Sequence, residues 1–275
     1  MATVPAGVRS RRPALNRTPD GGYGSEPGPY VVAHRGGAGL APENTYEAFS
    51  RSVSLGVSYL ETDVRLTADG VLVAFHDERV DRVTDLRGRV DRLPWAALKA
   101  AQVHGGGAVM TLAELLAAFP HQRFAIDLKA SDCIGTLTQV LQASRSVERV
   151  CVAGAWDGVL ARLREACGPG LRTALGWRSL TTLVACAKAG VRPPPWVATG
   201  EFVHVPISLG RVPLVAERLV RMGADLGVGV VVWTVDDPQL MHRLLDLGVD
   251  GIITDRPDLL REVLVQRGEW PAMRR

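Results

Sequence analysis

The feature that most constrains the fold is a regular alternation of short apolar runs with longer segments of helical periodicity, beginning at residue 30. Strands are expected at residues 30–33, 59–66, 123–128, 149–153, 172–176, 202–205, 228–235 and 251–254, with the run 71–75 as an extension of the second. Helices are expected at residues 45–55, 112–119, 134–143, 158–166, 180–189, 213–222, 238–247 and 257–265, and Asn44 or Thr45 is expected to cap the first of them. Apolar strands that each lead into a helix favour a parallel sheet, and eight such units predict a single (β/α)8 TIM barrel. The alternative is an open doubly wound sheet, but its glycine-rich GxGxxG phosphate-binding turn is absent.

Two segments do not follow this alternation of strands and helices. Residues 1–28 are rich in proline, glycine, arginine and serine without periodicity, which predicts a disordered tail before a barrel domain at 29–270. An arm that binds an anionic surface or nucleic acid weakly is the alternative for this tail. Residues 77–108 form a small insertion after the second strand, and a segment of this kind often lies over an active site.

Polar side chains recur where the expected strands end. They are His34 and Arg35, Glu61 and Asp63, His76, Asp127 and Lys129, His204, and Trp233. Charged groups inside apolar runs are costly unless they are paired or bind a metal. Because a TIM barrel carries its active site at the carboxyl ends of its strands, we expect these residues to form one site.

The carboxylates of the second strand point to a metal. Glu61 and Asp63 are two residues apart, so both side chains project from the same face of the strand. Two such carboxylates repel one another unless a cation lies between them, and their hard oxygen ligands favour Mg²⁺ or Ca²⁺. The alternative is that one of them pairs with an arginine, either Arg35 or Arg65.

Three motifs together resemble a known family. The run HRG…PENT at residues 34–45, the ETD at 61–63 and the FHD at 75–77 are similar to the glycerophosphodiester phosphodiesterases. The resemblance extends over roughly residues 30–262 and is specific because the three motifs occur together. It implies hydrolysis of a small-molecule glycerophosphodiester to glycerol 3-phosphate and an alcohol, within glycerol and lipid metabolism.

The resemblance also implies roles for individual residues. His34 and His76 become the acid–base pair, since an imidazole exchanges protons near neutral pH. Arg35 and Lys129 would bind the phosphate, and salt bridges to acidic neighbours are their alternative role. Asp127 becomes a third metal ligand beside Glu61 and Asp63; the family typically has Glu-x-Lys here, so this acid is one methylene shorter and a water could intervene. Trp233 belongs to a strand-seven motif, and its ring could form a wall of the substrate pocket.

Two other functions stay open on the sequence. One is a phospholipase-type phosphodiesterase acting on lysophospholipids or phosphatidylinositol, which needs an exposed apolar rim or a membrane helix. The other is a protein that binds glycerophosphodiesters without turnover, although the complete set of histidines and carboxylates speaks against it.

Composition limits the partners and the compartment. The formal net charge is only +3, which argues against nucleic acid as a partner. None of the four cysteines lies in a CxxC pair, and their apolar neighbours suggest free thiols in a reducing compartment. No apolar run suits a signal peptide or a membrane span, so we expect a cytoplasmic protein with no stable membrane insertion.

Overall fold

The computed structural model of the chain describes residues 22–26, 28–210 and 212–270. Its barrel strands are β1 (Tyr30–Ala33), β2 (Tyr59–Leu66), β4 (Arg123–Leu128), β5 (Val150–Gly154), β6 (Arg172–Thr173), β7 (Phe202–Pro206), β10 (Gly229–Trp233) and β11 (Gly251–Thr254). The other strands are β3 (Leu72–Ala74), which pairs antiparallel with β2, and β8 (Ser208–Leu209), which pairs with β9 (Val212–Pro213). The helices are α1 (Tyr46–Ser54), α2 (Trp95–Ala100), α3 (Leu112–Ala118), α4 (Ile134–Ala143), α5 (Asp157–Cys167), α6 (Trp177–Ala189), α7 (Glu217–Leu226), α8 (Pro238–Leu247) and α9 (Pro257–Gln266).

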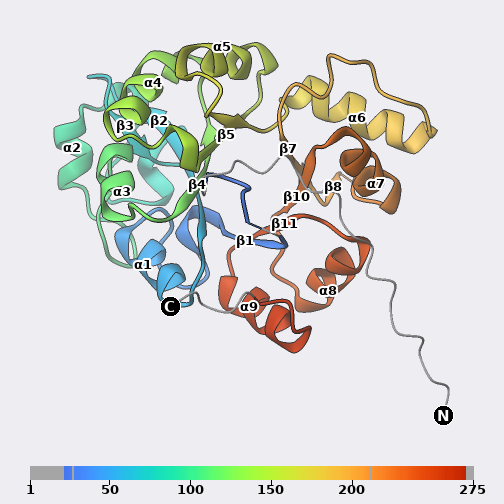
Figure 1. Cartoon of the computed structure of the whole chain (residues 1–275). Coiled ribbons are helices and arrows are strands. Elements are labelled where there is room, and N and C mark those ends of the chain that lie inside the picture. The colour runs from blue at the N-terminus through green and yellow to red at the C-terminus, as the bar shows by residue number, and fades with distance from the viewer. Residues whose placement is uncertain (1–21, 27, 211, 271–275) are drawn as a thin grey trace.

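These elements confirm the predicted TIM barrel. Within the described residues, eight parallel strands follow the order β6-β5-β4-β2-β1-β11-β10-β7, and helices surround them on the outside (Figure 1). The circle is nearly closed, because a single parallel bridge between Ala174 and Phe202 joins the β6 end to β7. The run at 71–75 is an extension of the second strand, as predicted, since β3 folds back on β2 and adds no strand to the barrel.

Local sequence explains where four of the helices begin. The side-chain oxygen of Thr45 accepts a hydrogen bond from the Ala48 N–H, so Thr45 caps α1. Thr111 and Glu114 form a reciprocal capping box at the start of α3. Proline stands in the first turn of α8 and of α9, where its missing N–H removes no helical hydrogen bond.

One predicted helix was misplaced. The sequence suggested a helix over residues 213–222, whereas the structure has the β8–β9 hairpin followed by α7. The predicted helix stopped just before Gly223, but this glycine lies inside α7 at a close contact with the barrel. A Cβ atom there would come within 2.7 Å of the Val228 carbonyl oxygen, so glycine permits the approach. The helix ends at Gly227, whose φ of 71° suits a left-handed cap.

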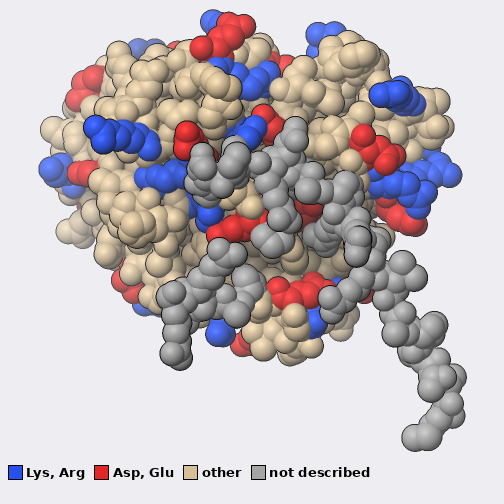
Figure 2. All heavy atoms as spheres, viewed as in Figure 1, with Lys and Arg blue, Asp and Glu red and all other residues tan. Residues whose placement is uncertain are grey.

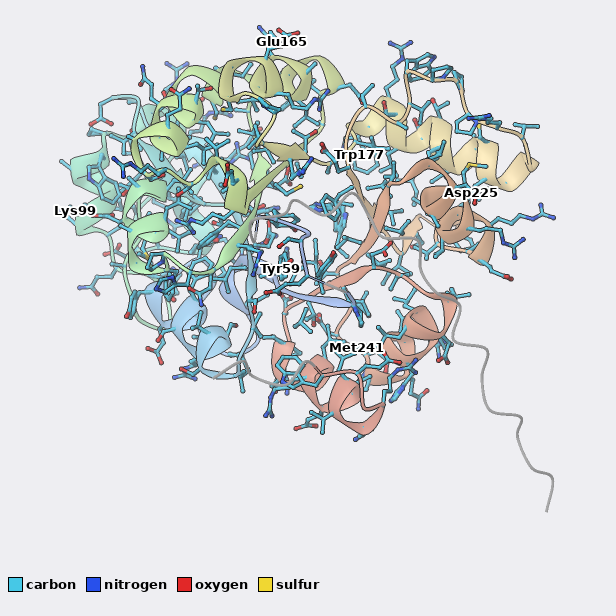
Figure 3. The ribbon with its side chains drawn as sticks, viewed as in Figure 1. Tyr59, Lys99, Glu165, Trp177, Asp225 and Met241 are labelled. Atoms are coloured by element: carbon cyan, nitrogen blue, oxygen red, sulfur yellow. The ribbon has the colours of Figure 1, made fainter. Side chains whose placement is uncertain are left out.

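Two apolar layers form the body of the protein. The larger lies between the strands and the surrounding helices, and the smaller fills the barrel interior. At one end of the interior, Tyr23 packs its ring edge-on against Tyr59 and Phe202, with centroid distances of 5.1 and 5.2 Å. Tyr59 lies inside the ring of helices in Figure 3. These aromatic rings fill that end of the barrel interior.

The ordered body starts earlier than the predicted boundary. Tyr23, which we assigned to a disordered tail, is only 2% exposed, and its N–H donates to the Glu148 carbonyl. Burying its ring inside the barrel offsets the entropy lost by ordering this segment. The rest of the predicted tail, residues 1–21 and 27, lies outside the described residues.

The insertion after the second strand has a small core of its own. Val73, Phe75, Val80, Leu98 and Val103 belong to this core, which includes one side of α2. Among the described residues, none from 77–108 lines the pocket at the strand ends.

The described surface has mixed charge. On the face seen in Figure 2, acidic and basic side chains are interspersed, in line with the small net charge of +3. Across the described residues, no helix is both long enough and apolar enough to cross a membrane.

Candidate active site

A pocket of about 330 Å³ opens at the carboxyl ends of the strands. The structure brings all eight predicted site residues into its lining: His34, Arg35, Glu61, Asp63, His76, Asp127, Lys129 and Trp233. They come from β1, β2, β4 and β10 and from the turn after β3, segments far apart in the sequence. The barrel geometry gathers them because parallel strands all end on the same side.

His34 is held by a carboxylate that the sequence analysis did not single out. Its Nδ1 donates to Oδ1 of Asp255, 2.7 Å away, and its Nε2 lies 4.0 Å from Oε2 of Glu61. Burial lowers the pKa of His34, but the Asp255 hydrogen bond and the Glu61 charge outweigh it and raise the pKa above its usual value. Asp255 directly follows β11, so its position at a strand end was the clue available in the sequence.

His76 has a matching arrangement. Its Nδ1 donates to Oδ1 of Asp77 at 2.7 Å, and the other Asp77 oxygen accepts from Nε of Arg82 at 2.6 Å. The Arg82 hydrogen bond, followed by that of His76, lowers the pKa of Asp77 below its usual range. Burial lowers the pKa of His76. Each histidine therefore has one ring nitrogen fixed by an aspartate, which leaves Nε2 for other partners.

Arg82 and Arg35 share one carboxylate. Both Nη atoms of Arg82 donate to Glu43, at 2.7 and 2.8 Å, and Nη1 of Arg35 donates to the same group at 2.9 Å. Burial raises the pKa of Glu43, but the bonds to these arginines lower it overall. Glu43 therefore holds Arg35, and the insertion reaches the edge of the site through Arg82.

The turn after β1 directs a backbone N–H into the site. Arg35 has a φ of 49°, in the left-handed region that non-glycine residues seldom adopt, and its N–H donates to Oε2 of Glu61 at 2.8 Å. Asn44 also has a positive φ, of 56°, and its Oδ1 accepts from Thr62 at 2.8 Å. Asn44 therefore braces β2, and of the two residues expected to cap α1 it is Thr45 that does so.

Glu61 and Asp63 lie side by side in the barrel and are 5% and 2% exposed. Burial, with the nearby Asp63 charge, raises the pKa of Glu61 to about 7. Oδ2 of Asp63 is buried without a hydrogen-bond partner, and the nearest arginine nitrogen, Nε of Arg35, is 3.4 Å away. A carboxylate oxygen left without a partner beside a second carboxylate suits a cation.

Asp127 is tied to Lys129. It lies beside Asp63 in the strand register, and Nζ of Lys129 is 2.6 Å from Oδ2 of Asp127 and 2.9 Å from Oδ1 of Asp63. Burial raises the pKa of Asp127, while the two acids raise that of Lys129 despite its own burial. Among the described residues, no cluster of three or more His, Cys, Asp or Glu side chains is arranged to hold a metal. Lys129 pairs with both Asp63 and Asp127, so a divalent ion held by these two acids would replace the lysine as their partner.

The rest of the pocket is largely apolar. His204 lines it from β7, and burial lowers its pKa to about 4, which keeps the ring neutral. Trp156 and Trp177 also line it, beside the predicted Trp233. The sequence analysis missed both, although each lies just beyond the end of a barrel strand.

Comparison with known sequences identifies relatives of the chain. The sequence profile described as the "Glycerophosphoryl diester phosphodiesterase family" matches residues 34–259. A Mycobacterium tuberculosis protein named "Probable glycerophosphodiester phosphodiesterase 2" is 38% identical over 246 residues, which span 88% of this chain and 93% of that protein. The glycerophosphodiester phosphodiesterase of Caldanaerobacter subterraneus is 30% identical, with 86% of this chain and 98% of that protein covered.

Solved structures share the fold. A glycerophosphodiester phosphodiesterase from Agrobacterium tumefaciens superposes with a TM-score of 0.69 at 24% identity, covering 85% of this chain and 99% of that one. An Oleispira antarctica phosphodiesterase, solved in complex with the product sn-glycerol-3-phosphate, gives a TM-score of 0.68 at 21% identity, with coverages of 86% and 97%.

Proposed function

The chain belongs to the glycerophosphoryl diester phosphodiesterase family, and we propose that it hydrolyses glycerophosphodiesters to glycerol 3-phosphate and an alcohol. One observation supports this most strongly: two histidines from different strands face one pocket, and each has a ring nitrogen fixed by an aspartate. A phosphodiester needs a proton removed from the attacking oxygen and another delivered to the leaving one. Two oriented imidazoles on one pocket meet both needs.

His34 and His76 are the proposed acid–base pair. One imidazole accepts the proton of the attacking hydroxyl, whose oxygen bonds to phosphorus. The hydroxyl belongs either to water or to the glycerol moiety of the substrate, and in the second case water then opens the resulting cyclic phosphate to glycerol 3-phosphate. The bond between phosphorus and the alcohol oxygen breaks, and the other imidazole protonates that oxygen. Asp255 and Asp77 keep each ring in the tautomer that presents Nε2 to the substrate.

Arg35 and Lys129 are the proposed phosphate-binding residues. Both line the pocket, and both already neighbour Asp63. Their positive charges offset the charge on the phosphate oxygens, which increases in the transition state. Trp233, at the end of β10, is proposed to contact the rest of the substrate.

Glu61, Asp63 and Asp127 would hold a divalent ion, Mg²⁺ or Ca²⁺. When bound, such an ion polarises the phosphate and lowers the pKa of a hydroxyl beside it. Two features of the chain support the assignment: Oδ2 of Asp63 has no hydrogen-bond partner, and the pKa of Glu61 is raised. For Asp127 the support is its position beside Asp63 in the sheet.

We further propose that the barrel domain, residues 29–270, functions in the cytoplasm. All four cysteines are free thiols, and Cys133 and Cys151 are buried. Burial raises the pKa of the Cys133 thiol to about 11. Unpaired thiols of this kind suit a reducing compartment.

The test is release of glycerol 3-phosphate from a panel of glycerophosphodiesters with Mg²⁺, with Ca²⁺ and with a chelator. We expect release that requires a divalent ion and that falls at least about 100-fold in His76→Ala, the range attributed to general acid–base groups. His121→Ala, an exposed histidine outside the pocket, is the matched control and should retain activity. Full activity in His76→Ala would overturn the assignment of His76, and no release under any condition would overturn the proposed reaction.

A further inference from the structure

The pocket has two chemically different walls. The charged wall comes from β1, β2 and β4 and carries the proposed phosphate-binding and metal-binding groups. A second, apolar wall is formed by the end of β5 and the segments after β5 and β6, and its side chains include Ala153, Trp156, Leu175, Trp177 and Leu180. Because the charged wall must hold the phosphate, the part of the substrate beyond the phosphate lies against the apolar wall.

Two tryptophans provide most of the aromatic surface of the apolar wall. Trp156 is 42% exposed and Trp177 is 39% exposed, although both line a cavity. Each stands where a barrel strand passes into its helix, and Trp177 lies at the start of α6 in Figure 3. A large aromatic surface left open to solvent inside a pocket gains free energy when a ligand covers it.

The distribution of charge in the pocket distinguishes between two kinds of ligand, an uncharged apolar group and an organic cation. Aromatic faces also attract organic cations, and a carboxylate without a positive partner nearby adds to that attraction. Here the carboxylates of the described lining come from β2 and β4, where Asp63 and Asp127 neighbour Arg35 and Lys129. Asp157 follows Trp156 but does not line the pocket, and its Oδ1 accepts from the Gly176 N–H at 3.2 Å. The apolar wall therefore offers no counter-charge to a cation.

We propose that the preferred substrate carries an uncharged hydrocarbon group, which Trp156, Trp177 and Leu180 bind beside the phosphate. This inference rests on the proposed phosphodiesterase function and names its substrate class. The hydrocarbon belongs either to the leaving alcohol or to an acyl chain on the glycerol. Both present the same chemistry to the apolar wall.

Two substrate series test the inference and separate the sources. In the first, the leaving alcohol of a glycerophosphodiester is lengthened from ethyl to butyl to hexyl. In the second, the alcohol stays ethyl and the glycerol carries acyl chains of increasing length, kept below the concentration at which they form micelles. In the series that matches the natural source, kcat/KM should rise about two- to fourfold per methylene while the chain lies in the pocket. A flat response in both series would overturn the inference.

A pair of isosteres tests the charge argument. Glycerophosphocholine and its 3,3-dimethylbutyl analogue have the same shape, but only choline carries a positive charge. The apolar wall predicts that the uncharged analogue reacts faster in kcat/KM. Faster turnover of choline would show that the wall binds a cation and would overturn the assignment of an uncharged group.

Variants test whether the dependence of kcat/KM on chain length arises from this wall. Trp156→Ala and Trp177→Ala should each reduce the dependence on chain length, and both residues are exposed enough that truncation spares the core. Trp196→Ala is the matched control: Trp196 is 41% exposed but lies outside the pocket, with the Arg178 guanidinium 4.4 Å from its ring centroid. If the dependence survives in both pocket variants, the assignment to these tryptophans is overturned. If the ethyl diester is not hydrolysed at all, the proposed function fails instead.

Discussion

Replacing Glu61 with glutamine should stabilise the metal-free protein while impairing its proposed activity. Glu61 is 5% exposed, and burial together with the Asp63 charge raises its pKa from 4.5 to about 7. The folded state therefore holds its proton more tightly than the unfolded chain does. Stability from this group is present below pH 4.5 and is lost as the pH rises through about 7. Glutamine removes the charge, and its carbonyl oxygen can still accept the Arg35 N–H.

The size of the effect follows from the pKa. Each pKa unit is worth about 1.4 kcal/mol, so a pKa raised to about 7 destabilises the ionised form by about 3 kcal/mol. At pH 8 the free energy of unfolding of Glu61→Gln should exceed that of the wild type by about this amount, or roughly 6–12 °C in Tm. At pH 5 most of the wild-type side chain is protonated when folded, and the difference should fall to about 1 kcal/mol or less.

The assay is urea or thermal unfolding of both proteins with chelator at pH 5 and pH 8, repeated with Mg²⁺ and with Ca²⁺. A bound divalent ion should remove the wild-type penalty, so the metal should stabilise the wild type more than the variant. A stability difference that does not change with pH would refute the raised pKa. Equal stabilisation of both proteins by metal would refute Glu61 as a ligand.

Two further predictions concern a hydrogen bond in the site and an arginine in the scaffold. Asp255→Asn should lower kcat/KM roughly 10- to 100-fold, because a hydrogen bond to a charged group contributes about 1.5–3 kcal/mol and Asp255 accepts one from His34. Steady-state kinetics checks this, and unchanged kinetics would show that Asp255 does not orient His34. Arg149→Met should lower stability by about 2–3 kcal/mol with little effect on kcat/KM, since Arg149 lies outside the pocket and donates to three carbonyls that would lose partners. Thermal unfolding beside kinetics checks it, and an unaltered Tm would mean that water replaces those bonds.

The sequence predicted the barrel because its information is local. Apolar runs of strand length, helical periodicity and caps are properties of neighbouring residues, and helices α4 and α8 have the bounds that the sequence suggested. Local patterns gave the wrong bounds for one helix. The helix expected at 213–222 is α7, Glu217–Leu226, and Gly223 lies inside it, where it allows close approach to Val228.

For the site, too, local sequence predicted some features and left others to the tertiary structure. Strand ends could be recognised from the sequence, so all eight candidate residues were found before the structure brought them into one pocket. Their partners could not be assigned, because pairing depends on which strand ends become neighbours. His34 and Asp255 are 221 residues apart and meet only when β11 returns beside β1.

The sequence by itself therefore determined the architecture and the chemical types at the strand ends, since both are encoded in short, periodic stretches. Only the tertiary structure decided how these groups interact. Closing the barrel placed Lys129 between Asp63 and Asp127, raised the pKa of Glu61 by burial, and set Trp156 and Trp177 into the same pocket as the charged groups. Distance and burial set the strength of electrostatic and apolar interactions, and both arise only when distant segments pack together.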